Sequence, residues 1–90
     1  MLVELLQLRK KIDKIDQLFL KLLAKRMQLV IAIGEFKWKK GLPIYIKERE
    51  NTILELRRKE AKKIGVSADL IEDILRRIIC ESYKYEKKKT

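Results

Sequence analysis

The sequence has no histidine, one cysteine, one proline and three glycines in 90 residues. Without histidine, a Ser-His-Asp triad, a Cys-His pair and a histidine-ligated zinc site are all impossible. No glycine-rich phosphate loop is present either. The single Cys80 cannot form an internal disulfide, which indicates a reducing cytoplasm. If the chain is an enzyme, its chemistry must therefore use Arg, Lys, Glu and backbone donors, and we expect neither a metal nor a cofactor.

What is abundant is charge and helix-forming apolar residues. Apolar residues make up 47% and charged residues 40%, which favours a small, helical, soluble domain that is able to form an oligomer. The net charge of +10 calls for an anionic partner, such as nucleic acid, a membrane surface or a small polyanionic metabolite. No apolar run approaches the roughly 18 residues of a membrane span, and no signal peptide precedes the first helix. Plentiful Lys, Glu and Ile, with a single Asn, resembles the composition of a heat-adapted prokaryotic protein.

We expect one all-α domain over residues 1–90, with a long first helix at about 2–39. Its apolar residues recur mostly every three or four positions, with one seven-residue step across Arg26. The residues of this stripe are Leu5, Leu8, Ile12, Ile15, Phe19, Leu22, Leu29, Ile33 and Phe36. A helix of roughly 35 residues is about 50 Å long, more than the rest of the chain can cover. A second chain is therefore expected beside it.

Two shorter helices are expected after the Gly41-Leu42-Pro43 break. One runs over about 47–64 and ends at Gly65 in a left-handed conformation. The other, over about 68–86, begins after Ser67 as its N-cap. The apolar positions of the two helices are, in order, Ile53, Leu56, Ala61, Ile64, and then Ile71, Ile74, Leu75, Ile78, Ile79. Tyr83 and Tyr85 carry no motif, so we interpret them as packing or surface residues.

Several charges fall where the helical stripes predict apolar residues. Arg26 and Lys37 share one helix face, about 16 Å apart along the axis, where they either flank a small ligand or extend to solvent. Arg9 lies 17 residues before Arg26, about 25 Å away and rotated by roughly 100°. One small ligand cannot reach both on the same helix, whereas an antiparallel dimer could bring the partner's Arg9 near Arg26.

These residues, taken in order, resemble the all-helical chorismate mutases. The similarity runs through Leu8-Arg9-Lys10-Lys11-Ile12-Asp13, Leu22-Leu23-Ala24-Lys25-Arg26, Lys37, Gly41-Leu42-Pro43-Ile44, Glu48-Arg49-Glu50 and Ile78-Ile79-Cys80-Glu81-Ser82. It covers nearly the whole chain, from about Leu5 to Glu86, in one register. The resemblance implies a three-helix subunit in an intertwined homodimer with two active sites, and a monofunctional isomerase that converts chorismate to prephenate in Phe and Tyr biosynthesis.

The resemblance also implies a role for individual residues. Arg9 matches an arginine that the partner subunit supplies, and Arg26 and Arg49 match in-chain residues around the substrate's anionic groups. Lys37 matches the cation near the ether oxygen. Glu50 matches the acceptor for the substrate hydroxyl, and Ser82 a carboxylate contact. The catalytic residues implied are thus Lys37, Glu86, Arg26 and Glu50.

Two positions depart from the commonest bacterial pattern. Ile46 stands where an aspartate is frequent. The resemblance implies that this position contacts the substrate hydroxyl through its backbone N–H, so the change need not abolish activity, but it makes Glu50 more important. Glu86 stands where many members have glutamine facing the ether oxygen. An ionised carboxylate there would repel the oxygen charge that develops, whereas a protonated one can donate a hydrogen bond. We therefore expect kcat/KM to fall as pH rises, and Glu86→Gln to flatten the profile.

The chemistry suits the residues, because the rearrangement is unimolecular and needs neither a nucleophile nor a proton shuttle. Three alternatives stay open. The same fold can serve an isochorismate pyruvate-lyase, or a plain helical dimerisation module without catalysis. A basic helical nucleic-acid-binding protein is the third, although thirteen acids are mixed among the 23 basic residues and no helix has an uninterrupted basic face.

Overall fold

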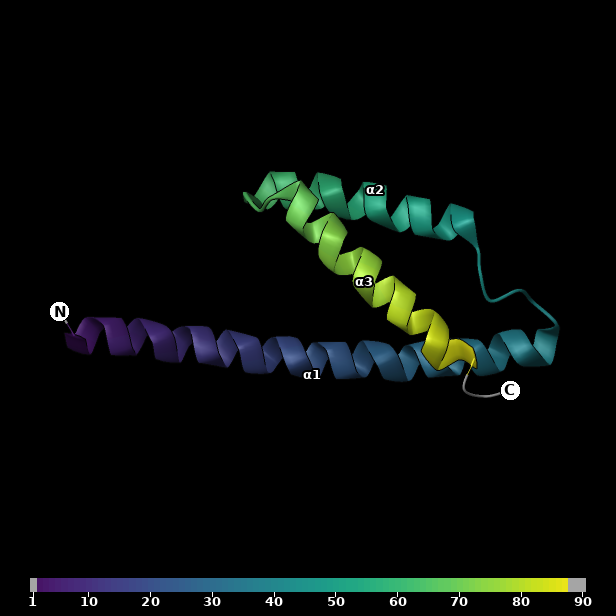
Figure 1. Cartoon of the computed structure of the whole chain (residues 1–90), viewed down its shortest axis with the longest axis horizontal. Coiled ribbons are helices and arrows are strands. Elements are labelled where there is room, and N and C mark those ends of the chain that lie inside the picture. The colour runs from purple at the N-terminus through teal and green to yellow at the C-terminus, as the bar shows by residue number, and fades with distance from the viewer. Residues whose placement is uncertain (1, 88–90) are drawn as a thin grey trace.

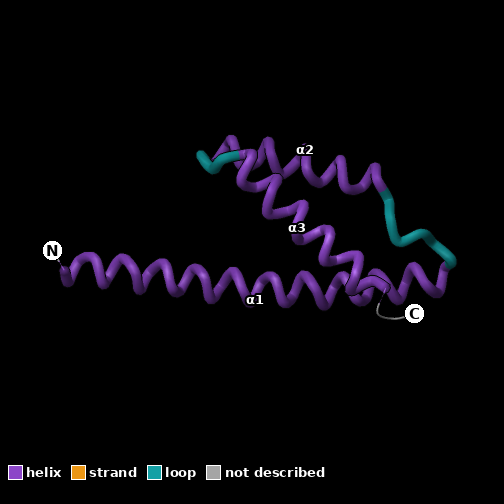
Figure 2. Tube along the Cα trace, viewed as in Figure 1, coloured by secondary structure: helices purple, strands orange, loops and turns teal. Residues whose placement is uncertain are grey.

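The computed structural model describes residues 2–87 as three helices joined by two short connections (Figures 1 and 2). Helix α1 spans Leu2–Lys40, α2 spans Lys47–Ile64 and α3 spans Ala68–Lys87, and these residues contain no strand. The fold is therefore all-α. The first and third helices each end one residue later than the sequence pattern predicts, which is within the usual uncertainty of a helix end.

Helix α3 lies between the other two and packs against both, while the backbones of α1 and α2 do not approach each other closely within residues 2–87. Figure 1 shows that α2 and α3 form a hairpin over the C-terminal half of α1, whereas the N-terminal half of α1 projects away from it. The radius of gyration is 16.8 Å. A compact chain of this length would have a value of about 12 Å. Much of α1 therefore has no neighbour from its own chain.

The turn between α2 and α3 is built as the sequence predicts. Gly65 has φ 80°, and the N–H of the next residue, Val66, donates to the Ala61 carbonyl at 2.9 Å. This left-handed ending is available to glycine without steric cost. The Ser67 Oγ accepts a hydrogen bond from the N–H of Leu70 at 3.2 Å, which makes it the N-cap of α3.

Ion pairs tie the two arms of this hairpin together. Arg58 on α2 lies 2.9 Å from Asp69 and 3.0 Å from Glu72, both on α3. Glu72 also pairs with Arg76 one turn further along, at 2.7 Å. The hydrogen bond from Arg76, followed by the charges of Arg76 and Arg58, holds the pKa of Glu72 below its usual value.

The buried core of the single chain is small. The buried apolar residues are Val30, Leu54, Ala61, Ala68 and Ile79. Leu56 and Ile64, two of the apolar positions of α2, are 47% and 76% exposed in the single chain. Within residues 2–87, α2 packs against α3 alone, and its buried residues are Leu54 and Ala61.

The apolar stripe of α1 remains uncovered in the single chain. Its nine residues are all exposed, from 42% for Leu5 to 66% for Leu29. A contiguous apolar surface of this kind commonly marks an interaction site in soluble proteins. Within residues 2–87, none of the helices combines the length and the apolar character needed to cross a bilayer.

Candidate active site

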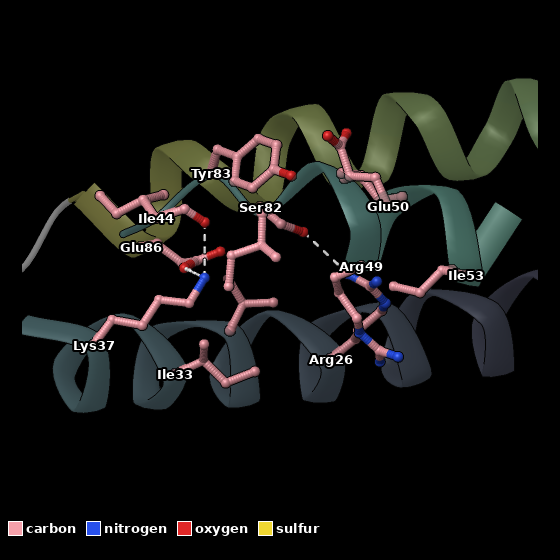
Figure 3. Close-up of a pocket in the computed structure, with 13 residues that line it drawn as sticks. Arg26, Ile33, Lys37, Ile44, Arg49, Glu50, Ile53, Ser82, Tyr83 and Glu86 are labelled. Carbon is pink, nitrogen blue, oxygen red and sulfur yellow. Dashed lines mark hydrogen bonds and ion pairs between the residues drawn. The ribbon is translucent and has the colours of Figure 1, made fainter. Parts of the chain in front are cut away.

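A cleft of about 370 Å³ lies where α3 meets the C-terminal half of α1 and the start of α2 (Figure 3). This volume is within the range of small-molecule sites. Its lining comes from all three helices and from the loop between α1 and α2. The lining residues are Arg26, Val30, Ile33, Lys37, Ile44, Ile46, Arg49, Glu50, Ile53, Ile79, Ser82, Tyr83 and Glu86.

One end of the cleft is formed by a largely buried ion pair. The Lys37 Nζ lies 2.7 Å from the Glu86 Oε1, and their side chains are 13% and 8% exposed. The contact is an ion pair rather than a directed hydrogen bond, because the Glu86 Oε1 has no hydrogen-bond partner of good geometry. Lys37 also donates to the Ile44 carbonyl at 2.8 Å, which fastens the loop after α1 onto this end of the cleft.

The other end of the cleft gathers positive charge. Arg26 donates from its Nη1 to the Ser82 Oγ at 3.0 Å, and the Ser82 hydroxyl donates in turn to the Ile78 carbonyl at 2.7 Å. Burial lowers the pKa of the Arg26 guanidinium, and the charges of Arg49 and Arg57 lower it further. Like charges drawn together in this way favour an anionic ligand between them.

Glu50 and Tyr83 form the wall between these two ends. Figure 3 shows the Tyr83 ring over the cleft, with its hydroxyl on the side that faces the Glu50 carboxylate. Burial raises the pKa of Tyr83 to about 12, and hydrogen bonding to Glu50 is the next largest cause. The phenol is therefore neutral at physiological pH and can donate its proton to a hydrogen bond.

Comparison with known families shows which family the chain belongs to. Residues 8–87 match the model of the family described as chorismate mutase type II. The chain belongs to that family.

The similar proteins include two T-proteins and a chorismate mutase. The chain is 54% identical over 89 residues to the T-protein of Enterobacter agglomerans, covering 99% of this chain and 24% of the relative. It is 53% identical over 79 residues to the T-protein of Haemophilus influenzae, covering 88% of this chain and 21% of the relative. It is 40% identical over 70 residues to the chorismate mutase of Methanocaldococcus jannaschii, covering 78% of this chain and 71% of the relative. The chain thus spans about a quarter of the length of the T-proteins that it matches.

The cleft of this chorismate mutase family member gathers nearly every residue that the sequence singled out. Seven of them line it, namely Arg26, Lys37, Ile46, Arg49, Glu50, Ser82 and Glu86. Arg9 does not. It is exposed on the N-terminal half of α1, outside the cleft of its own chain. Within residues 2–87, no group of three or more His, Cys, Asp or Glu side chains could hold a metal ion.

Sequence reasoning missed Tyr83, which it assigned to packing or surface. A usable signal was present, because Tyr83 lies three residues before Glu86 and therefore shares a helix face with it. The apolar residues Ile33 and Ile79, which belong to the predicted helical stripes, also line the cleft.

Proposed function

We propose that residues 1–90 form a chorismate mutase domain that rearranges chorismate to prephenate without a metal or cofactor. The observation that carries this proposal is the meeting of Arg26, Lys37 and Glu50 in one cleft of a chain that belongs to the chorismate mutase type II family. Chorismate carries two carboxylates, an ether oxygen and a hydroxyl, and the cleft offers a partner of suitable chemistry for each.

The arginines bind the carboxylates in this scheme. A guanidinium group donates two parallel hydrogen bonds to a carboxylate, which fixes orientation as well as charge. Arg26 is held by Ser82 at 3.0 Å, so its position is set before the substrate arrives. Holding both carboxylates keeps the substrate in the compact, chair-like conformer from which the C–C bond forms as the C–O bond breaks.

Lys37 stabilises the negative charge that develops on the ether oxygen. An ammonium group has three N–H donors. One is used by the Ile44 carbonyl and a second faces Glu86, which leaves a third for the substrate. Because the charge on the ether oxygen grows only in the transition state, this contact raises kcat rather than only tightening binding. Glu86, when protonated, adds a hydrogen bond to the same oxygen.

The substrate hydroxyl is bound at the start of α2 in this scheme. Glu50 accepts its hydrogen bond, and the backbone N–H of Ile46 is the second contact. Ile46 has an apolar side chain that also lines the cleft, so it adds no second carboxylate at this point. Glu50 is therefore the carboxylate on which recognition of the hydroxyl depends.

A second copy of the chain completes the site. Support comes from the exposed apolar stripe of α1 and from a radius of gyration well above that of a compact chain. Two α1 helices packed antiparallel would cover each other's stripes and carry the Arg9 of each chain toward the cleft of its partner. The dimer is intertwined, and each of its two active sites contains residues from both chains.

The direct test is the loss of chorismate absorbance after purified protein is added, with prephenate identified as the product. We expect turnover without added metal and in the presence of a chelator. Isochorismate and duplex DNA serve as comparison ligands in a turnover assay and a salt-dependent gel shift. Pyruvate release from isochorismate without chorismate turnover would show that the chain is a lyase and not a mutase. Light scattering of the same sample should give the mass of a dimer.

The setting proposed is the reducing cytoplasm of a heat-adapted prokaryote. Cys80 is a free thiol on the surface, which supports a reducing compartment. The composition supports heat adaptation. A thermal unfolding midpoint in the range of ordinary mesophilic domains, about 45–65 °C, would contradict the second inference.

A further inference from the structure

Tyr83 occupies a position in the cleft that no step of the proposed rearrangement uses. It follows Ser82 on α3 and lines the cleft together with Glu50 and Glu86. Its side chain is partly buried, and its hydroxyl is on the side of the ring that faces Glu50 (Figure 3). The two side chains come from different helices, so together they bring the start of α2 and the last turns of α3 to the same cleft.

The ring of Tyr83 packs against a second aromatic ring. Tyr45, in the loop between α1 and α2, meets it edge to face with ring centroids 4.6 Å apart and an interplanar angle of 62°. The ammonium of Lys87 lies 4.8 Å from the centroid of the Tyr45 ring. Edge-to-face aromatic pairs and cation–π contacts are both favourable geometries. Tyr83 therefore presents its hydroxyl from a ring with little freedom to turn away.

Glu50, by contrast, is attached to the first turn of α2 through a flexible side chain. A carboxylate that must accept a hydrogen bond from a ligand hydroxyl works only if it is held in the correct orientation. Ile46, the other side chain at this end of the α1–α2 loop, is apolar and can offer no hydrogen bond to it. The phenol of Tyr83 is the neutral donor beside Glu50, and it stays protonated well above physiological pH.

We propose that Tyr83 is a positioning residue for Glu50, acting through its hydroxyl to orient the carboxylate toward the substrate hydroxyl. This role rests on the proposed function. Tyr83 would set how strongly the site selects substrates that carry this hydroxyl, without touching the bond that breaks. Because the ring also contacts Tyr45, the same residue couples the α1–α2 loop to the geometry of Glu50.

The test is a double-mutant cycle on chorismate turnover with Tyr83→Phe, Glu50→Gln and the combination. We expect Tyr83→Phe to lower kcat/KM about tenfold, the scale of one hydrogen bond to a charged group. In the Glu50→Gln background the same change should cost less than about twofold, because the carboxylate to be oriented is gone. Tyr85→Phe, which removes a phenol hydroxyl two residues away and outside the cleft, is the matched control and should behave as wild type.

If Tyr83→Phe lowered kcat/KM by the same factor in both backgrounds, its role would be merely structural and the proposal would be overturned. An unchanged kcat/KM in Tyr83→Phe would overturn it as well. A spectrophotometric titration of the phenols tests the contact without any catalysis. In the wild type the last tyrosine should ionise near pH 12, and Glu50→Gln should move that step to lower pH. An unchanged titration curve would also overturn the proposal. Wild-type protein that leaves chorismate unchanged while the titration shifts would refute the proposed function and leave the contact established.

Discussion

Gly34 and Glu86 lie against each other where α1 and α3 cross. A Cβ atom at Gly34 would lie only 2.7 Å from both the Cα and the carbonyl oxygen of Glu86, closer than real Cβ contacts come. The absence of a side chain at Gly34 therefore allows the approach that seats Glu86 beside Lys37 at 2.7 Å. One glycine on α1 thus controls the geometry of one end of the cleft, three residues before the lysine that the site uses.

Gly34→Ala is expected to damage both stability and activity. The neighbouring atoms are backbone and cannot swing aside, so α3 must shift, at a cost of about 1–3 kcal/mol. The shift displaces Glu86 from Lys37, and kcat should fall with it. Gly65→Ala is the matched control, since its left-handed φ of 80° costs about 1–2 kcal/mol at the far turn. Denaturant unfolding should show a similar loss of stability in the two variants, whereas enzyme kinetics should show a loss of kcat only in Gly34→Ala. Equal kcat values in both variants would contradict the proposed link between Gly34 and the position of Glu86.

Lys37→Ala is expected to lower kcat by about 10²–10³, the scale of removing one oxyanion donor. The loss should fall on kcat more than on KM, because the charge on the ether oxygen is absent from the ground state. Lys39→Ala removes the same charge from an exposed position of the same helix and controls for long-range attraction of the dianion. Near-wild-type turnover by Lys37→Ala would mean that the ammonium does not face the reacting oxygen.

Glu86→Gln is expected to remove the pH dependence of the reaction. In the wild type, kcat/KM should fall as pH rises, because the ionised Glu86 repels the developing charge and engages the Lys37 ammonium, whereas the protonated form can donate a hydrogen bond to the ether oxygen. A neutral amide of the same shape keeps a donor at this position at every pH, so the profile becomes flat. Glu81→Gln, on the same helix but outside the cleft, should keep the wild-type slope. A wild-type rate independent of pH would argue against this role of Glu86.

Local sequence signals were sufficient for the helices and their ends. Gly65 and Ser67 are specific to one backbone geometry each, so their roles as helix ending and N-cap are confirmed. The faces of the helices were harder to predict. Leu56 and Ile64 are as apolar as Leu54. Which of the three is buried in the single chain depends on the side of α2 that packs against α3.

The site shows the same division between local and tertiary information. Arg26 and Lys37 share a helix face by spacing alone, and both line the cleft. The spacing of Tyr83 and Glu86 places both on one face of α3, but the role of Tyr83 depends on which residue of α2 lies opposite it, and only the structure shows that residue. An aromatic residue on α3 is consistent with packing, surface or site until Glu50 is placed beside it.

Glu72→Gln is expected to make the chain less sensitive to acid. The folded-state pKa of Glu72 is lowered by its hydrogen bond from Arg76 and by the charge of Arg58, so the ionised form is the one that the fold stabilises. That stabilisation is present above the unfolded pKa, about 4.3, and is lost as pH falls through the lower folded value. In urea unfolding, the free energy of unfolding should therefore decrease less between about pH 6 and 3 for Glu72→Gln than for the wild type. Asp73→Asn, on the next residue, is the control, and an identical loss in Glu72→Gln and wild type would contradict the assignment.

Mixing inactive variants tests whether Arg9 completes the partner's site. Arg9→Ala and Lys37→Ala should each be inactive as homodimers. After denaturation and refolding together, half of the dimers are mixed, and one of their two sites contains neither substitution. Activity should therefore return to about a quarter of the wild-type value. Arg26→Ala mixed with Lys37→Ala should recover nothing, because both residues come from the same chain and every site then lacks one of them. Equal recovery in the two mixtures, or none in either, would place Arg9 outside the partner's cleft.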